Sequence, residues 1–288
     1  MNKIGIYYAY WTHEWDVDFH PFIEKVADLG FDILEVNAGT VAQMSSGERM
    51  GLKAHAEDRG LTLTYCIGLP HEYDIAAEDQ AVRANGVAYL QQMAGAIGEM
   101  GGGPMGGIIY SAWPHTLPKG VTDKSPYLER SVQSMREAIK AAEDNDVFFN
   151  MEVVNRFEQF LLNTAEEGLA YVQAVGSPNA KVMLDTFHMN IEEDFIAEAI
   201  LKVGDHLGHL HIGENNRMPP GYGHIPWVEI GAALRQIDYE GYVVMEPFLL
   251  PGGQVGSDIK VFRDLSVGLD LDEEARKALL FTRGALGE

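Results

Sequence analysis

The chain has 288 residues, of which 46% are hydrophobic and 22% are charged, and its 43 acidic and 21 basic side chains give a formal net charge of -22. This surplus of negative charge repels phosphate backbones and anionic lipid heads, so we expect neither nucleic acid nor a membrane surface as a partner. A single cysteine, Cys66, excludes an intrachain disulfide and a CxxC motif. It is typical of a reducing compartment, which predicts a cytoplasmic protein.

Short runs of β-branched, aromatic or other apolar residues recur along the chain, and each is followed by a segment with helical spacing. We predict eight strands, at 4–10, 33–37, 61–67, 107–111, 147–154, 181–185, 207–213 and 242–247. Their starts lie roughly 25 to 45 residues apart, which is the size of a βαβ unit. Gly30 and Gly60 stand where a helix should end with a residue of positive φ, and 271–286 reads as a last helix that closes the ring.

Regular alternation of strand and helix predicts a single (β/α)8 TIM barrel over residues 1–288, because no linker or low-complexity block interrupts the series. A doubly wound α/β sheet is the alternative. The fingerprint G-x-G-x-x-G is missing after the first strand, which argues against that sheet. In a barrel, polar groups at the C-terminal ends of the strands face the active site.

Ionisable residues stand at the ends of the last four predicted strands: Glu152, Asp185, His209 with His211, and Glu246. The two histidines point to the same side of one strand, and we favour His211 because it is nearer the C-terminal end. His209 then lies behind the site or in the core. Buried carboxylates need a cation or strong donors, so Glu152, Asp185, His211 and Glu246 are predicted to bind Mn2+, Co2+, Mg2+ or Fe2+, with Zn2+ as a further candidate. For any one of them, a salt bridge or a hydrogen-bonded core position is the alternative.

Glu152 and Glu246 come from strands three places apart around the ring, so they approach its centre from separate directions. Two carboxylates on opposite sides of a substrate can remove a proton from one face of a carbon and return one to the other. A divalent metal that chelates a carbonyl oxygen and the adjacent hydroxyl would acidify the C–H bond between them and stabilise the enediolate. The predicted reaction is proton abstraction next to a carbonyl, with inversion.

Further polar residues follow the same strand ends. Glu158, His188 and Arg217 lie on predicted loops of this rim, where loop capping or surface charge is the alternative to substrate binding. The aromatic residues near other strand ends are Tyr7, Trp15, Trp113 and Phe248. They could form an apolar wall against the C–H faces of a sugar, or they could simply pack in the core.

These residues, taken together, resemble the ketose 3-epimerase family, which includes D-tagatose 3-epimerase and D-psicose (D-allulose) 3-epimerase, within the xylose isomerase-like barrels. The similarity is densest in Glu-Val-Val-Asn-Arg-Phe-Glu at 152–158, Leu-Asp-Thr-Phe-His-Met-Asn-Ile-Glu-Glu at 184–193, His-Ile-Gly-Glu-Asn-Asn-Arg at 211–217 and Met-Glu-Pro-Phe at 245–248. It begins at 5–11 and covers nearly the whole chain. The Gly-rich run at 100–107 departs from the family pattern, and we expect it to precede the strand that leads to Trp113.

The resemblance implies a function for each matching position. Glu152, Asp185, His211 and Glu246 match the family's metal ligands, and the two glutamates also match its acid/base residues. Glu158, His188 and Arg217 match residues that hold the O1 and O2 end of the ketose, and Cys66, Trp15, Trp113 and Phe248 match the pocket wall. Family members use Mn2+ or Co2+ and form homodimers or homotetramers.

We therefore predict an isomerase that inverts C3 of free ketoses through a metal-bound enediolate, with D-fructose/D-psicose and D-tagatose/D-sorbose as typical pairs. A related barrel enzyme that isomerises an aldose and a ketose, or a hydroxy-keto acid, is the first alternative, and a non-catalytic sugar-binding or metal-binding protein is the second. DNA-repair endonucleases of related barrels are disfavoured, because they need a histidine-rich multi-zinc site and a polyanionic partner.

Overall fold

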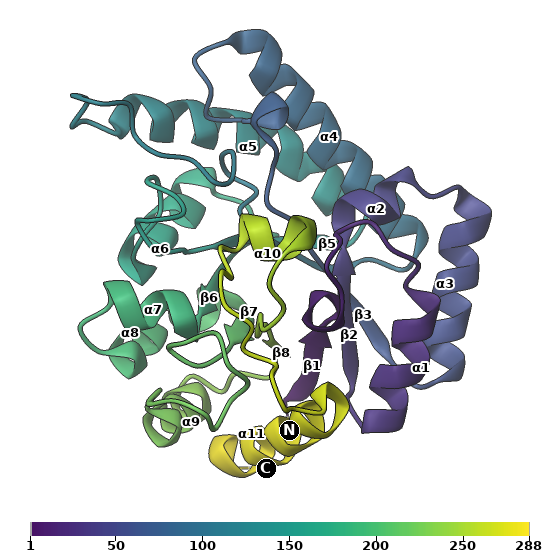
Figure 1. Ribbon diagram of the computed structural model, residues 1–288. Coiled ribbons are helices and arrows are strands. Elements are labelled where there is room, and N and C mark those ends of the chain that lie inside the picture. The colour runs from purple at the N-terminus through teal and green to yellow at the C-terminus, as the bar shows by residue number, and fades with distance from the viewer. Residues whose placement is uncertain (1, 288) are drawn as a thin grey trace.

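The computed structural model describes residues 2–287, so Met1 and Glu288, the two ends of the predicted domain, lie outside it. Within this part, eight parallel strands pair in chain order and β8 also pairs with β1, which closes the sheet into a barrel (Figure 1). The strands are β1 (Lys3–Tyr7), β2 (Ile33–Asn37), β3 (Thr62–Cys66), β4 (Gly103–Gly107), β5 (Val147–Glu152), β6 (Ala180–Asp185), β7 (Leu207–Ile212) and β8 (Tyr242–Met245). The predicted (β/α)8 TIM barrel is confirmed.

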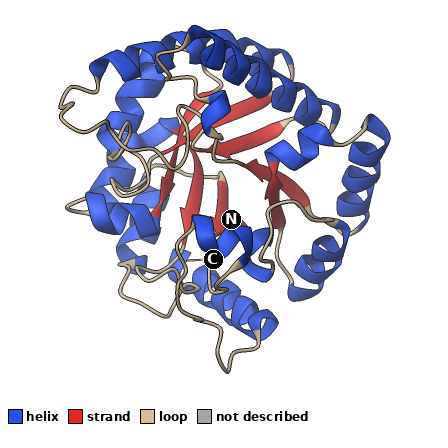
Figure 2. Ribbon diagram, turned by 45° about the horizontal axis from the view of Figure 1, so that its top comes forward, coloured by secondary structure: helices blue, strands red, loops and turns tan. Residues whose placement is uncertain are grey.

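Helices surround the strands, which Figure 2 shows gathered in the middle of the molecule. They are α1 (His20–Leu29), α2 (Ala38–Gln43), α3 (Ser46–Asp58), α4 (Gln80–Glu99), α5 (Ser125–Asp144), α6 (Ala165–Val175), α7 (Thr186–Glu192), α8 (Ile196–Val203), α9 (Trp227–Gln236), α10 (Gly253–Asp258) and α11 (Leu271–Leu286), with 3-10 turns η1 (Tyr8–Trp11), η2 (His71–Tyr73) and η3 (Gly204–His206). The predicted last helix has the bounds of α11, which packs against both α9 and α1 and so completes the ring. None of the helices in residues 2–287 is long and apolar enough to cross a membrane.

Local chemistry determines where several of these helices begin and end. Gly30 ends α1 with a φ of 88°, and Gly60 follows α3 with a φ of 72°, as predicted for residues that close a helix in the left-handed region. Asp185, the last residue of β6, begins α7 because its side chain accepts a hydrogen bond of 2.7 Å from the N–H of Phe187. The short turn from strand to helix therefore leaves Asp185 at the C-terminal rim of the barrel.

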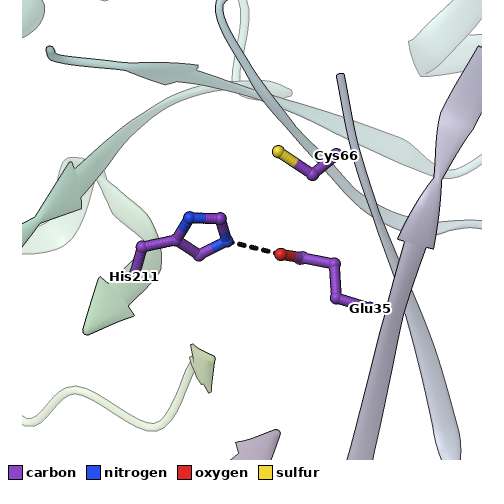
Figure 3. Close-up of side chains that lie close together, drawn as sticks. All are labelled: Glu35, Cys66 and His211. Carbon is purple, nitrogen blue, oxygen red and sulfur yellow. Dashed lines mark hydrogen bonds and ion pairs between the residues drawn. The ribbon is translucent and has the colours of Figure 1, made fainter. Parts of the chain in front are cut away.

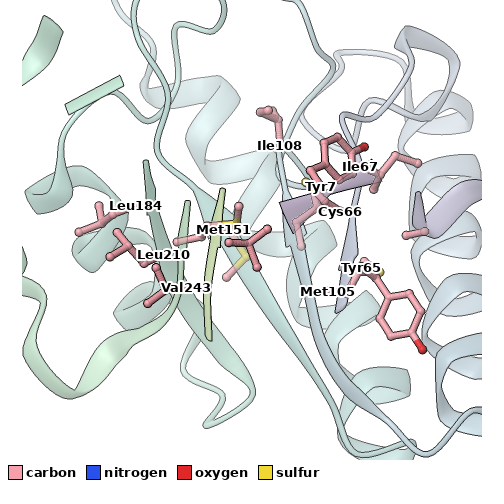
Figure 4. Close-up of a cluster of buried hydrophobic side chains, with 14 of the residues drawn as sticks. Tyr7, Tyr65, Cys66, Ile67, Met105, Ile108, Met151, Leu184, Leu210 and Val243 are labelled. Carbon is pink, nitrogen blue, oxygen red and sulfur yellow. The ribbon is translucent and has the colours of Figure 1, made fainter. Parts of the chain in front are cut away.

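Strand residues alternate between the barrel interior and the layer of helices. Leu184, Leu210 and Val243 are paired in register on β6, β7 and β8, and they belong to one buried apolar cluster (Figure 4). Asp185 and His211 come directly after the first two and therefore point to the opposite side of the sheet. The helices cover these three apolar side chains, whereas Asp185 and His211 face the interior of the barrel.

The fourth strand is not where the sequence predicted it. We expected it at 107–111, but β4 spans Gly103–Gly107 and pairs with β5 from Gly103 opposite Val147 to Gly107 opposite Met151. Glycine is needed here because of close approach: a Cβ on Gly106 would collide with the sulfur of Met183, and one on Gly107 with the carbonyl of Ile67. The Gly-rich run therefore forms the strand itself, whereas the other predicted strands overlap observed ones with ends that differ by a few residues.

Candidate active site

Four ionisable side chains meet where the last four strands end. Glu152 and Asp185 are the last residues of β5 and β6, His211 is the last but one of β7, and Glu246 directly follows β8. One ligand atom from each lies within 4.8 Å of those of the other three. The first three are buried, and the Glu246 side chain is 11% exposed. The structure thus brings together all four residues of the predicted metal set.

The donor atoms of this cluster fit a divalent cation. Nδ1 of His211 is buried without a hydrogen-bond partner, 3.6 Å from Oε1 of Glu152 and 3.5 Å from Oε1 of Glu246. A buried ring nitrogen and several carboxylate oxygens around one point form a set of nitrogen and oxygen ligands without a thiolate. The described residues can therefore bind a metal ion, and hard or borderline cations suit them best.

Arg217 supplies the positive charge on the other side of this cluster. Its Nη1 lies 3.1 Å from Oε2 of Glu246 and 3.6 Å from Oδ2 of Asp185, and its Nη2 lies 3.4 Å from Oε1 of Glu158. Burial lowers the pKa of the guanidinium, but the nearby carboxylates raise it by more than burial lowers it. The net shift of the pKa is therefore upward. Arg217 has a φ of 63°, and its guanidinium carbon lies 3.8 Å from the ring centre of Phe187. A strained backbone and a stacked ring hold this group in one position.

His188 presents a defined ring nitrogen to the site. Its Nδ1 accepts hydrogen bonds from the backbone N–H of Asn155 at 3.2 Å and from the side-chain amide of the same residue at 2.7 Å. Its Nε2 faces the cavity side of the cluster, 3.5 Å from Nη2 of Arg217 and 3.9 Å from Oδ2 of Asp185. Glu158, in turn, accepts a hydrogen bond of 3.0 Å from the Asn155 amide. Asn155, which sequence analysis overlooked, thus orients two of the predicted substrate-binding residues.

A cavity of about 520 Å³ opens above the cluster. Every residue predicted to bind substrate lines it, together with both predicted acid/base residues: Tyr7, Trp15, Cys66, Trp113, Glu152, Glu158, His188, Arg217, Glu246 and Phe248. Trp113 Nε1 donates to Oε2 of Glu158 at 3.1 Å, and Trp15 Nε1 donates to Oδ2 of Asp258 at 2.8 Å. The aromatic residues near the strand ends therefore form a wall of the cavity. Polar residues such as Asn37, His71 and Glu72 also line it, and no spacing in the sequence would have identified them.

Two of the glutamates differ in how readily they hold a proton. Burial raises the pKa of the Glu152 carboxyl, and the nearby Glu246 raises it further, against the lowering effect of His211. Burial also acts on Glu158, but His188, Arg217 and two hydrogen bonds outweigh it, so the pKa of that carboxyl lies below its ordinary value. Glu152 is therefore suited to exchange a proton, and Glu158 to remain ionised.

Sequence analysis did not identify Glu35, which lies below the cluster. This residue is fully buried on β2, and Nε2 of His211 is hydrogen-bonded to its Oε1. His209 lies in the same layer, with Nε2 2.9 Å from Oε2 of Glu35. One signal was present: an acidic residue interrupts the apolar run Ile-Leu-Glu-Val at 33–36. A charge within a buried strand needs partners, and these come from the far side of the barrel.

A closed parallel barrel with a buried cluster of acids and histidine under a cavity at its C-terminal rim is the architecture of a barrel enzyme. Comparison with known proteins specifies the family. The model of the xylose isomerase-like TIM barrels matches residues 23–265. D-psicose 3-epimerase of Agrobacterium fabrum is 48% identical over 99% of this chain and 99% of its own, and that of Ruminiclostridium cellulolyticum is 50% identical over 99% and 98%.

Solved structures give the same result. A D-psicose 3-epimerase from Clostridium cellulolyticum H10 with D-tagatose superimposes with a TM-score of 0.95 at 50% identity, covering 99% of each chain. A D-psicose 3-epimerase in the presence of D-fructose superimposes with a TM-score of 0.96 at 48% identity, covering 99% of this chain and 100% of that one. The chain therefore belongs to the xylose isomerase-like TIM barrels and, within them, to the ketose 3-epimerases, which are enzymes.

Proposed function

We propose that this protein is a metal-dependent 3-epimerase of free ketoses, with D-fructose/D-psicose and D-tagatose/D-sorbose as substrate pairs. The observation that carries the proposal is the placement of Glu152 and Glu246 at the ends of separate strands, each with an oxygen about equally far from Nδ1 of His211, where both line the cavity. The names of the relatives, D-psicose 3-epimerase in both cases, support the substrate class.

Glu152, Asp185, His211 and Glu246 would hold the cation, which we expect to be Mn2+ or Co2+, with Mg2+ as an alternative. Their nitrogen and carboxylate oxygen atoms suit these ions better than thiophilic ones. When bound, the cation supplies Lewis-acid stabilisation of the negative charge that develops on substrate oxygens as the proton leaves C3. The strongest support for this assignment is Nδ1 of His211, a buried ring nitrogen without a hydrogen bond that faces oxygens of Glu152 and Glu246 at 3.6 and 3.5 Å, because buried ring nitrogens normally make a hydrogen bond.

The two glutamates divide the proton transfer between them. One of Glu152 and Glu246 takes the proton from C3, and the other gives a proton to the opposite face, which inverts the carbon. The configuration of the substrate determines which residue acts first. Support comes from the position of the two carboxylates, which face Nδ1 of His211 from the ends of two different strands.

The remaining residues hold the sugar in place. Glu158, Nε2 of His188 and the guanidinium of Arg217 would bind the O1 and O2 end, with the carboxylate as acceptor and the guanidinium as donor. On the other side of the cavity, Tyr7, Trp15, Cys66, Trp113 and Phe248 would pack against the distal carbons and exclude water. The cavity, about 520 Å³, is of ordinary size for a small-molecule site.

Other properties stay predictions. They are a single domain over residues 1–288, a homodimer or homotetramer, and a location in the cytoplasm. Size-exclusion chromatography with light scattering would measure the oligomer directly.

Incubation with D-fructose tests the proposal. Protein that has been stripped with a chelator and then supplied with Mn2+ should form D-psicose, detected by chromatography, and the stripped protein should form much less. The proposal is wrong if no 3-epimer appears from any ketohexose or ketopentose.

Deuterated water separates this reaction from aldose–ketose isomerisation, the first alternative. A 3-epimerase exchanges the hydrogen on C3, whereas an isomerase of the same fold places deuterium on C1 or C2. Mass spectrometry and NMR of the recovered sugar locate the label. Tight sugar binding without any exchange would favour a binding protein instead.

A further inference from the structure

Glu35 is a buried carboxylate that the proposed reaction does not use. It lies in the middle of β2, its side chain is fully buried, and it is paired in register with Tyr7 of β1 and Thr64 of β3. Its ion pairs within residues 2–287 are both with histidines of β7, and none is with a lysine or arginine. Figure 3 shows its carboxylate extended toward the ring of His211, with Cys66 to one side.

Each oxygen of this carboxylate has its own partner. Oε1 is hydrogen-bonded to Nε2 of His211. Oε2 accepts a hydrogen bond of 2.8 Å from the hydroxyl of Thr64 and lies 2.9 Å from Nε2 of His209. Thr64 comes from the neighbouring strand β3 and His209 from β7 across the interior, and both contact Oε2, so Oε1 is left to meet the ring of His211.

The polarity of this hydrogen bond determines which nitrogen of His211 is free. An ionised carboxylate can only accept, so Nε2 must carry a proton. A histidine that binds a metal does so as the neutral ring, and Nδ1 then has a lone pair and no proton. Nδ1 is the atom that faces Glu152 and Glu246, and it has no hydrogen-bond partner.

We propose that Glu35 is a positioning residue, which holds the ring of His211 in place as the Nε2–H tautomer and so keeps Nδ1 available to bind the metal. The inference rests on the proposed function, because it assigns a second residue to the same metal centre. Carboxylates that orient a metal-binding histidine through its other nitrogen are a recurrent device in metalloenzymes.

Glu35→Gln keeps nearly the same side-chain volume but can reverse the direction of the hydrogen bond to His211. Its amide can donate to Nε2 of His211, which would favour the tautomer with a proton on Nδ1, pointing at the metal position. Valine at position 64 would instead remove one hydrogen bond to Oε2 and leave the bond to His211 in place. Glutamine at position 274 is a control for the loss of a buried carboxylate, since Glu274 is 5% exposed and lies on α11, in the helix layer.

Binding of Mn2+ to the full-length, chelator-stripped protein tests the proposal, with free Mn2+ counted by electron paramagnetic resonance. We expect Glu35→Gln to bind Mn2+ about 10- to 100-fold more weakly than wild type. Thr64→Val should stay within about threefold, because only a bond remote from the ring is lost, and Glu274→Gln should match wild type. Circular dichroism confirms that each variant is folded.

The tautomer can be read in the wild-type protein, so the test does not depend on a variant that folds. Long-range 1H–15N spectra of protein with 15N-labelled histidine, loaded with diamagnetic Zn2+, should show His211 with its proton on Nε2. His211→Asn identifies the signal.

The possible outcomes are distinct. Equal Mn2+ affinity of wild type and Glu35→Gln, or a proton on Nδ1 of His211 in wild type, would overturn the role of Glu35 and leave the metal centre intact. A wild-type protein that binds no Mn2+ would instead overturn the metal centre of the proposed function. Weaker binding by Glu35→Gln together with the Nε2–H tautomer would support the inference.

Discussion

The two halves of the barrel contribute different kinds of side chain to one cavity. Strands β1 to β4 end in the uncharged residues Tyr7, Asn37, Cys66 and Gly107. In strands β5 to β8, by contrast, Glu152, Asp185, His211 and Glu246 stand at or beside the end. Charge at the strand ends is therefore concentrated in the second half, although Asp16 and Glu72 of the first half also line the cavity, farther along its loops.

This asymmetry has an electrostatic consequence. An apolar wall excludes water, so interactions among the charged groups facing it are stronger than they would be in solvent. The raised pKa of the Glu152 carboxyl, with burial as its largest cause, is an example. Glu35 of the first half also reaches the cluster, through its hydrogen bond to His211. Glu35 apart, the division predicts that changes in the second half affect turnover and metal binding, and that changes in the first half affect mainly substrate affinity.

The largest effect should come from the two glutamates of the second half. We expect Glu152→Gln or Glu246→Gln to lower kcat for D-psicose about 10³-fold, because a glutamine cannot exchange a proton with C3. Chromatographic assay of D-fructose formation gives the rate. Glu240→Gln, an exposed position just before β8, is the matched control and should retain full activity. Near-normal turnover by either variant would remove that residue from the proton transfer.

Metal removal should have the next largest effect, and it can be measured without substrate. A cation bound only to the folded state stabilises it, so Mn2+ at about 100 times its Kd should raise the Tm of stripped wild type by roughly 5 °C. Asp185→Asn should abolish most of this shift, while Asp205→Asn, an exposed position, should keep it. Differential scanning fluorimetry gives the values. An equal shift in Asp185→Asn would show that Mn2+ binds elsewhere.

A smaller effect is expected from the aromatic wall. Trp15→Phe keeps a ring in the cavity but loses the hydrogen bond of 2.8 Å to Asp258, so we expect KM for D-psicose to rise about two- to tenfold at similar kcat. Trp11→Phe is the control, because the Trp11 indole donates to Asp272 at 2.7 Å and does not line the cavity. A large fall in kcat for Trp15→Phe would break the division between the two halves.

The smallest effect concerns stability and pH at Glu158. Its folded-state pKa lies below the ordinary value of 4.5, because His188 and Arg217 outweigh burial. The ionised group therefore stabilises the fold above that ordinary value, and the stabilisation is lost as the pH falls through the folded-state pKa. We expect Glu158→Gln to be less stable than wild type near neutral pH, with the difference shrinking in acid. Urea unfolding across this range measures it, and a constant difference would contradict the lowered pKa.

Much of the site could be predicted from the sequence because the barrel topology follows from a regular pattern. Once alternating strands and helices indicate a closed parallel ring, the C-terminal ends of the strands must share one rim. An acid or histidine that follows an apolar run is then placed there with no knowledge of distances. Glu152, Asp185, His211 and Glu246 could be grouped in this way, although their chain positions span almost a hundred residues.

Tertiary structure alone decided the rest. The strand position of the Gly-rich run depends on the approach of Met183 and Ile67 to Gly106 and Gly107, which local propensity does not encode. The contact between Glu35 and His211 depends on which residues of β2 and β7 face each other across the interior, at a separation of 176 positions. Sequence periodicity assigns a residue to a face of its own strand, whereas contact across a barrel depends on how the strands are staggered around the ring.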